Sequence, residues 1–156
     1  MAYYLGIDPG KTGAACLIQY PEIKIIDWDG VINTSVQIKA WNSFYGIEGV
    51  YIEKIHAMQK DSDHIVSMSK LIRNAGQWEG ILCALSIPIK EISPKQWRKG
   101  IYKPSDRRPL KQRSLDAARR LFPEYVEAYF SREKDHNRAE AALIAYQAER
   151  YFNNEK

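Results

Sequence analysis

The sequence contains few cysteines and no long hydrophobic run. Its two cysteines, Cys16 and Cys83, lie far apart in apolar surroundings, which predicts buried, reduced thiols and argues against a disulfide or a zinc site. No segment has the roughly 18 consecutive apolar residues that a membrane-spanning helix requires, and the first residues lack the regions of a secretory signal. We therefore expect a soluble protein of the cytoplasm that does not contact membranes.

Signs of disorder and of a large charge imbalance are also absent. The 156 residues are 45% hydrophobic and 12% aromatic, and the formal net charge is only +4. A chain of this length and composition can bury one sizeable core but has no room for a second one. We expect one domain that spans residues 1–156.

The positive charge is nonetheless concentrated in one stretch. Residues 95–120 contain ten basic residues and only two acidic ones, Asp106 and Asp116. Such a stretch favours a polyanionic partner such as nucleic acid. A solvated helix face would have the same composition, and this remains the alternative interpretation.

The apolar periodicity predicts alternating strands and helices. We expect strands at residues 3–8, 14–20, 23–28, 49–53 and 88–92. We expect helices at residues 34–45, 67–85, 110–122 and 137–152, with a short helical turn within 96–103. This order predicts an α/β fold in which an antiparallel meander opens a mixed five-stranded sheet flanked by helices, and it resembles the RNase H-like fold.

Three carboxylates stand where these elements should meet. Asp8 ends the first strand, Glu53 ends the fourth, and Glu140 lies one turn into the last helix. If the two strands are neighbours, their carboxylates emerge at the same sheet edge and can share a cation. Oxygen ligands without cysteine favour Mg²⁺ or Mn²⁺, and two such ions about 4 Å apart can activate a water for phosphodiester hydrolysis. Acids at strand ends are often simply solvated, which is the competing interpretation.

Four segments, in order, resemble those of the RuvC-type Holliday-junction resolvases of the RNase H-like superfamily. Residues 6–14, Gly-Ile-Asp-Pro-Gly-Lys-Thr-Gly-Ala, are similar to the family's first strand and turn, and residues 50–54 to its acidic fourth strand. Residues 92–99 and 134–145 resemble the PxxW(K/R)K and DHxRAEALLIA segments of the phage-type branch. Actin-like ATPases carry a loop similar to the first segment, but a second phosphate loop is absent here.

The resemblance implies a role for each acid. The residues implied to be both catalytic and metal ligands, with two Mg²⁺ ions replaceable by Mn²⁺, are Asp8, Glu53 and Glu140. The fourth ligand maps to Asp135 or His136, and His136, which is also implied to be catalytic, is preferred because some relatives use histidine there. Bacterial relatives place this ligand three residues before the last acid, where this chain has Asn137. They also carry an aromatic wedge three residues after the glutamate, where this chain has His56.

The resemblance also implies a DNA-binding surface and a homodimer. The side chains expected to contact phosphates are Lys95, Arg98, Lys99, Arg107 and Arg108. Trp97 could stack on a base, but a core indole is the favoured interpretation. A homodimer would nick a four-way junction symmetrically, leaving 5′-phosphates, in the cytoplasm of bacteria or phage-infected bacteria. The helix over 67–85 would form the dimer, because Ile65, Trp78 and Ile81 spread its apolar surface widely.

Two other classes of function remain open. One is a related nuclease that acts on other branched DNA or on RNA. The other is a non-catalytic protein that binds branched DNA. A purely binding protein has no need for the acids, yet Asp8, Glu53 and Glu140 are all present.

Overall fold

A mixed five-stranded sheet forms the centre of the structure, a computed structural model that describes residues 1–10, 12–55 and 62–155. Its strands are β1 (Tyr3–Asp8), β2 (Ala14–Gln19), β3 (Glu22–Asp27), β4 (Ile47–Glu53) and β5 (Ile89–Ile92). Their spatial order is β3-β2-β1-β4-β5. The β1–β2 and β2–β3 pairs are antiparallel, whereas β4 is parallel to both β1 and β5. The predicted meander and mixed sheet are therefore confirmed.

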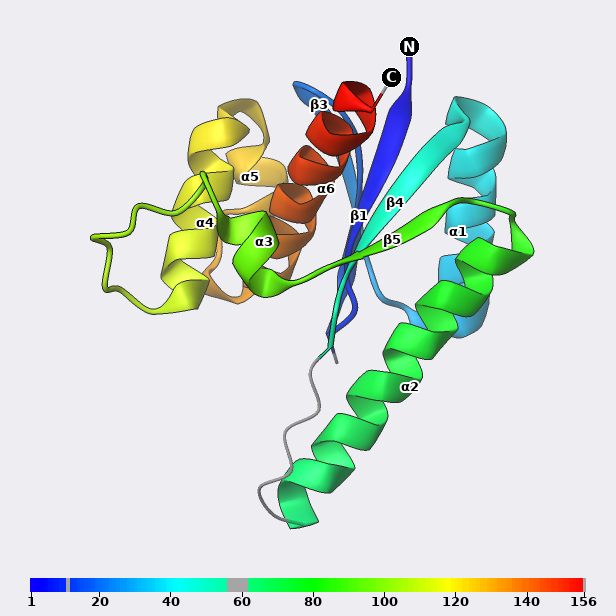
Figure 1. Cartoon of the computed structure of the whole chain (residues 1–156), viewed down its shortest axis with the longest axis horizontal. Helices are drawn as coiled ribbons and strands as arrows, with labels where there is room; N and C mark the ends of the chain where they lie inside the picture. The colour runs from blue at the N-terminus through cyan, green and yellow to red at the C-terminus, as the bar shows by residue number, and fades with distance from the viewer. Residues whose placement is uncertain (11, 56–61, 156) are drawn as a thin grey trace.

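Helices cover both faces of the sheet (Figure 1). On one face lie α1 (Gly30–Tyr45) and α2 (Ser62–Ala84), and on the other α3 (Pro94–Arg98), α4 (Leu110–Leu121), α5 (Val126–Tyr129) and α6 (His136–Asn154). Short 3-10 turns, η1 (Pro123–Tyr125) and η2 (Glu133–Asp135), precede α5 and α6. The sequence pattern does not predict α5, and α1 and α2 begin four and five residues before their predicted starts. Their opening segments, with Gly30 in one and Ser62 in the other, resemble turns in sequence.

Alternate side chains of each strand point to opposite faces of the sheet, as the pleat requires. Tyr4 and Tyr51 join the core beneath α4 and α6, whereas Leu5 and Val50 join the core beneath α1 and α2. The position of a residue along its strand therefore decides which set of helices its side chain meets.

The close approach of α6 to β1 depends on Gly6. A Cβ atom at this position would lie 2.1 Å from the backbone nitrogen of Ala145 and 2.6 Å from the carbonyl oxygen of Ala141. Only a residue without a side chain fits between the strand and the helix backbone. This contact, two residues before Asp8 and near the first turns of α6, brings the end of β1 close to Glu140.

The apolar spacing within α1 predicts the helix correctly but not its buried face. The side chains of Val36 and Phe44 are 62% and 82% exposed, whereas Thr34 and Ile38 are buried. The helix therefore packs through a narrow stripe, and several of its large apolar residues face outward. Packing against α2 and the sheet, rather than local periodicity, selects that stripe.

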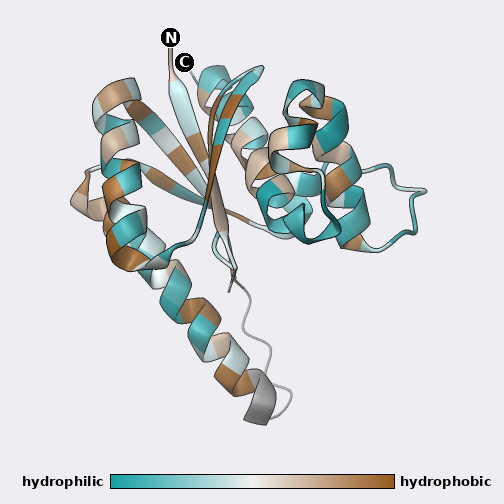
Figure 2. Ribbon diagram, turned by 180° about the vertical axis from the view of Figure 1, so that it is seen from behind, coloured by the Kyte–Doolittle hydropathy of each residue, from teal (hydrophilic) through white to brown (hydrophobic). Residues whose placement is uncertain are grey.

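The prediction that α2 exposes a wide apolar surface is wrong for two of the named residues, but other apolar residues of this helix are exposed. Trp78 and Ile81 are buried, and the indole of Trp78 packs 4.9 Å from that of Trp28, so these two residues belong to the core. Ile65, Val66 and Ile72 are each more than half exposed. They lie in the first half of α2, the end of the helix that extends beyond the sheet, where hydrophobic segments alternate with polar ones (Figure 2).

The two cysteines differ in their surroundings. Cys16 is buried, and burial raises the pKa of its thiol, as expected for an inert core residue. Cys83 is exposed, so the prediction of burial is wrong for this residue, which lies on the outer side of the last turn of α2. Across the described residues, no helix combines the length and apolarity needed to cross a membrane.

Candidate active site

The parallel pairing of β1 with β4 brings Asp8 and Glu53 to one edge of the sheet. Ile7 lies opposite Ile52, so the next residue of each strand, Asp8 and Glu53, ends its strand at the same level. Strand alternation places both side chains on the face that α6 covers. The predicted proximity of these two strand ends is therefore present.

Asp8 is a buried carboxyl in contact with another acid. Its side chain is 5% exposed, and it accepts a hydrogen bond of 3.1 Å from the backbone N–H of Gly10. Burial raises the pKa of Asp8 well above its usual range, and the charges of Glu140 and Glu53 raise it further. Glu140 exerts the larger of these two charge effects. The two carboxyls therefore share a proton more readily than they carry two negative charges.

Glu140 occupies the first turns of α6 and receives support from α4. The hydroxyl of Ser114 donates a hydrogen bond of 3.2 Å to its Oε1. Burial raises the pKa of Glu140, while the Ser114 hydrogen bond and the positive charges of Arg98 and Lys111 act in the opposite direction. Glu140 is thus the point where the basic segment of the chain meets the acidic cluster.

Glu53 is held by an indole. The Nε1–H of Trp97 donates a hydrogen bond of 2.5 Å to Oε2 of Glu53. Trp97 itself is fully buried, so its interpretation as a core indole is confirmed, and it has no free face for a base. A capping box at Ser93 and Gln96 begins α3 and fixes the position of Trp97.

The carboxylates of Asp8, Glu53 and Glu140 do not surround a common point in this structure. Among the described residues, no three Asp, Glu, His or Cys side chains are arranged so that they could hold a metal ion as they stand. Glu140 and, more weakly, Glu53 act on Asp8 through their charges. A bound cation would therefore require these side chains to move toward one another.

Asp135, one candidate for the fourth ligand, is occupied by other groups. It is 3% exposed and accepts hydrogen bonds from the Nη2 and the backbone N–H of Arg132, at 2.7 and 2.9 Å. Arg138 lies 3.7 Å away. These contacts stabilise the start of α6, and in this arrangement Asp135 is an ion-pair partner of Arg132 and Arg138.

His136, the other candidate, is partly exposed and lies beside the turn that precedes it. Its Nδ1 is 3.3 Å from the carbonyl oxygen of Glu133. Asn137, at the position three residues before Glu140, donates hydrogen bonds of 2.8 and 2.5 Å to the backbone oxygen and hydroxyl of Thr12. Asn137 thus ties α6 to the turn after Asp8. His56 lies outside the described residues.

The predicted phosphate contacts fall into two groups. Lys95, Lys99 and Arg107 are exposed, as a DNA-binding role requires. Arg108 instead forms ion pairs with Asp106, at 2.8 Å, and with Asp116. Its charge is therefore already balanced within the chain, because the two acidic residues of the basic stretch both pair with it.

Arg98 is half-buried and lies inside the site. Its guanidinium carbon is 5.0 Å from the centre of the Trp97 ring, and its charge acts on Glu140. Within the described part of the chain, the buried Nε atoms of Arg98 and Arg113 have no hydrogen-bond partner.

Sequence reasoning missed Ser114, Tyr102 and Arg113. Ser114 is fully buried between apolar residues of α4, and the hydroxyl of Tyr102 hydrogen-bonds to it. A small polar residue on the apolar face of an amphipathic helix is a recognisable signal for Ser114. No comparable signal identifies Tyr102, since its contact with α4 bridges a connecting segment.

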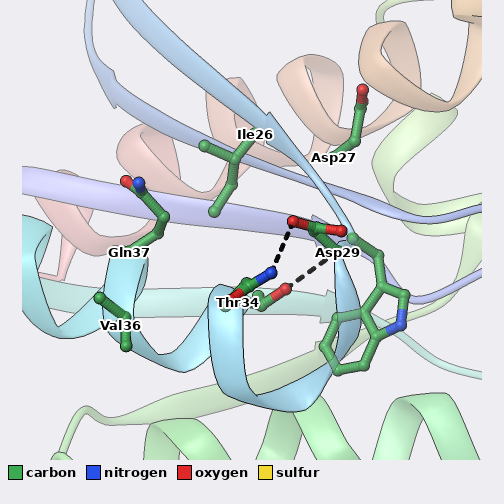
Figure 3. Close-up of a pocket in the computed structure, with 8 residues that line it drawn as sticks. Ile26, Asp27, Asp29, Thr34, Val36 and Gln37 are labelled. Carbon is green, nitrogen blue, oxygen red and sulfur yellow. Dashed lines mark hydrogen bonds between the residues drawn. The ribbon is translucent and has the colours of Figure 1, made fainter.

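A separate cavity of about 650 Å³ lies between the end of β3 and the start of α1 (Figure 3). Its polar groups pair with one another: Asn33 donates to the Asp29 carboxylate at 3.0 Å, and the Asp29 N–H donates to the Thr34 hydroxyl at 3.1 Å. Asp27, also in its lining, forms an ion pair with Arg138. Asp8, Glu53 and Glu140 do not line this cavity. We therefore place the candidate active site at these three acids, because of their chemistry, and not at the cavity.

Comparison with solved structures identifies proteins of the same fold. Thermus thermophilus RuvC in complex with a Holliday junction substrate matches with a TM-score of 0.66 at 12% identity, over 98% of this chain and 97% of RuvC. A second structure of T. thermophilus RuvC gives 0.58 at 15% identity, over 92% and 90% of the two chains. The yeast mitochondrial Holliday junction resolvase Ydc2 gives 0.57 at 17% identity, over 92% and 76%.

The likeness is one of fold. No protein-family model matches the sequence, and no curated protein matches it either. The structural matches nonetheless extend over nearly the whole chain. The predicted RNase H-like fold and the structural resemblance to RuvC-type resolvases are confirmed.

Proposed function

We propose that this chain is a metal-dependent endonuclease that cuts four-way or otherwise branched DNA. The observation that carries the proposal is the convergence of Asp8, Glu53 and Glu140 from three separate elements at one sheet edge. Acids held together without a matching cation destabilise a fold, so such a cluster indicates a functional site. The fold shared with RuvC and Ydc2 supports branched DNA as the substrate class.

The three acids fit Mg²⁺ or Mn²⁺. They supply only oxygen donors, which hard divalent cations prefer, and a cation would relieve the repulsion that raises the pKa of Asp8. When bound, a pair of such ions supplies an activated water and stabilises the leaving oxygen of the phosphodiester. His136 remains the proposed fourth ligand; its Nδ1 lies 3.3 Å from the Glu133 carbonyl oxygen, so Nε2 would be the atom that binds the ion.

The basic residues would position the DNA. Lys95, Lys99 and Arg107 are exposed and can contact backbone phosphates. Arg98, whose positive charge acts on Glu140, would also attract a phosphate nearer the acids. Such contacts orient the backbone without reading its sequence, as a structure-selective nuclease requires.

Paired cleavage of a junction would require two copies of the chain. Each chain carries one acidic cluster, and a homodimer with two-fold symmetry matches the symmetry of a four-way junction. The exposed Ile65, Val66 and Ile72 in the first half of α2 would offer an apolar surface for that contact. In this proposal the two subunits make symmetric nicks that leave 5′-phosphates.

The decisive experiment compares DNA substrates and metal conditions. Synthetic four-way, three-way and linear duplexes of equal length are incubated with the protein in Mg²⁺, in Mn²⁺ and in EDTA. We expect cleavage of the four-way junction in either metal, little cleavage of linear duplex, and none in EDTA. Ligation of the products with DNA ligase tests for paired nicks with 5′-phosphates.

Matched variants separate chemistry from binding. Asp8→Asn, Glu53→Gln and Glu140→Gln each keep the shape of the side chain and should abolish cleavage while leaving junction binding in EDTA within about threefold, since phosphate contacts supply the affinity. Asp27→Asn, which alters an exposed acid paired with Arg138, serves as the control and should cleave normally. Tight junction binding by a wild-type protein that never cleaves would instead establish a non-catalytic binding protein.

A further inference from the structure

A continuous chain of side chains connects two of the clustered acids. It begins at Glu53, which accepts the hydrogen bond of 2.5 Å from the Trp97 indole. The ring of Trp97 meets that of Tyr102 edge to face, with centroids 5.8 Å apart and an angle of 82° between the planes. The hydroxyl of Tyr102 hydrogen-bonds to that of Ser114, and Ser114 reaches Oε1 of Glu140 at 3.2 Å.

The number of available protons determines which group donates in each hydrogen bond of this series. A serine hydroxyl has one proton to donate and two lone pairs that accept. Ser114 lies within reach of three oxygens, those of Glu140, Tyr102 and the Leu110 carbonyl, the last at 2.9 Å. When Ser114 donates to Glu140, Tyr102 must donate to Ser114. The Tyr102 hydroxyl then donates to a lone pair of the Ser114 oxygen. This favours the Ser114 rotamer that donates its own proton to the Glu140 carboxylate.

Two guanidinium groups restrain Tyr102. The guanidinium carbons of Arg98 and Arg113 lie 5.9 and 5.2 Å from the centre of its ring, close enough for a cation–π attraction. Ser114 is fully buried. Both members of the pair are therefore held in place by their surroundings, as residues that orient a ligand must be.

We propose that Tyr102 and Ser114 are positioning residues that hold the Glu140 carboxylate in the orientation needed to bind a divalent cation. The inference rests on the proposed metal-dependent function and deepens it. Neither residue touches the ion or the DNA; Ser114 acts on Glu140, and Tyr102 acts through Ser114. Trp97 serves Glu53 in the same manner from the other end of the chain.

Mn²⁺ binding by the full-length protein without DNA tests this proposal directly. Free Mn²⁺ is measured by electron paramagnetic resonance during titration of the wild type, Ser114→Ala, Tyr102→Phe and the double variant. Asp8→Asn defines the background of weak surface binding. Tyr125→Phe is the matched control, because it removes a tyrosine hydroxyl that hydrogen-bonds to an exposed acid, Glu22, away from the cluster.

We expect Ser114→Ala to weaken Mn²⁺ binding by about 10- to 100-fold, the usual effect of removing a hydrogen bond to a metal ligand. Tyr102→Phe should weaken it less, and the double variant should bind no more weakly than Ser114→Ala alone, because the two hydroxyls act in series. Tyr125→Phe should bind as the wild type does. Thermal melts of each variant verify folding, and Tyr102→Phe remains informative if Ser114→Ala folds poorly.

Cleavage assays separate this proposal from the proposed function. A wild type that cleaves junctions, with Mn²⁺ affinity unchanged in both Ser114→Ala and Tyr102→Phe, would overturn the positioning role and leave the nuclease intact. A loss of affinity equalled by Tyr125→Phe would overturn it as well. A wild type that neither binds Mn²⁺ nor cleaves would remove the nuclease proposal, and the positioning role with it.

Discussion

Replacing Asp8 by Asn should stabilise the metal-free protein while destroying its activity. Asp8 is 5% exposed and lies against Glu140, so burial and like charges both raise the pKa of its carboxyl. Its negative charge at neutral pH therefore costs free energy. Asparagine keeps the side-chain oxygen that accepts the Gly10 N–H hydrogen bond but carries no charge at any pH.

The size of the effect follows from the environment of Asp8. A buried, poorly compensated polar group costs about 1–3 kcal/mol, so the free energy of unfolding should rise by about that amount in EDTA at pH 7.5. For a domain of this size each kcal/mol corresponds to about 2–4 °C in Tm. The expected increase in Tm is therefore about 2–12 °C.

The gain should depend on pH with a definite sign. Because the pKa of Asp8 is raised in the folded state, its favourable contribution is complete below the unfolded pKa and is lost as the pH rises through the folded pKa. The difference between Asp8→Asn and the wild type should therefore be near zero at about pH 3 and grow toward neutral pH. Millimolar Mg²⁺ should stabilise the wild type alone and narrow the difference.

Thermal and urea denaturation of both proteins, in EDTA and in Mg²⁺, measure these differences. Asp27→Asn is the control, since Asp27 is exposed and pairs with Arg138 at 2.6 Å, so its loss should not stabilise the fold. An Asp8→Asn protein that is less stable than the wild type in EDTA at pH 7.5 would refute the reasoning. A stability gain that is the same at pH 3 and pH 7.5 would contradict its electrostatic origin.

Three further predictions concern packing, DNA contact and assembly. Gly6→Ala should lower the free energy of unfolding by about 2 kcal/mol or more in urea denaturation, because the added Cβ would lie 2.1 Å from the α6 backbone. Gly76→Ala is the control, since nothing lies within 4 Å of its added Cβ. Arg107→Gln should lower the salt dependence of junction binding by about one unit of slope, whereas Arg108→Gln should lower it less because Arg108 is ion-paired; equal slopes would contradict this distinction. Val66→Lys should convert a dimer to a monomer in sedimentation at micromolar concentration and abolish paired cleavage while retaining single nicks. A wild-type monomer on junction DNA would exclude the dimer.

The order of strands and helices could be predicted from the sequence because it depends on local periodicity. Short apolar runs bounded by turn residues specify β1, β2 and β4, and alternating apolar residues specify β3. Three- to four-residue spacing specifies α2 and α6. The same local information places Asp8 and Glu53 at strand ends and Glu140 on the last helix. For these reasons local patterns are enough to indicate the fold class and the three central acids.

Which side chains contact one another could not be predicted, because these contacts depend on residues far apart in the chain or on packing between elements. Periodicity marks α1 as a helix but does not tell which side is buried, so exposed Val36 and Phe44 suggest the wrong face. Composition marks Arg108 as a phosphate contact, yet its ion pair with Asp116 forms only when the loop folds against α4.

The candidate active site could likewise be predicted only in part. Local sequence is sufficient to identify the acids available at the sheet edge, since each stands on an element that its own neighbours define. Which of these acids touch, and that Trp97 and Ser114 support Glu53 and Glu140, depends on how the elements pack together. Burial and hydrogen bonding here arise between elements that are distant in sequence, and no local pattern encodes them.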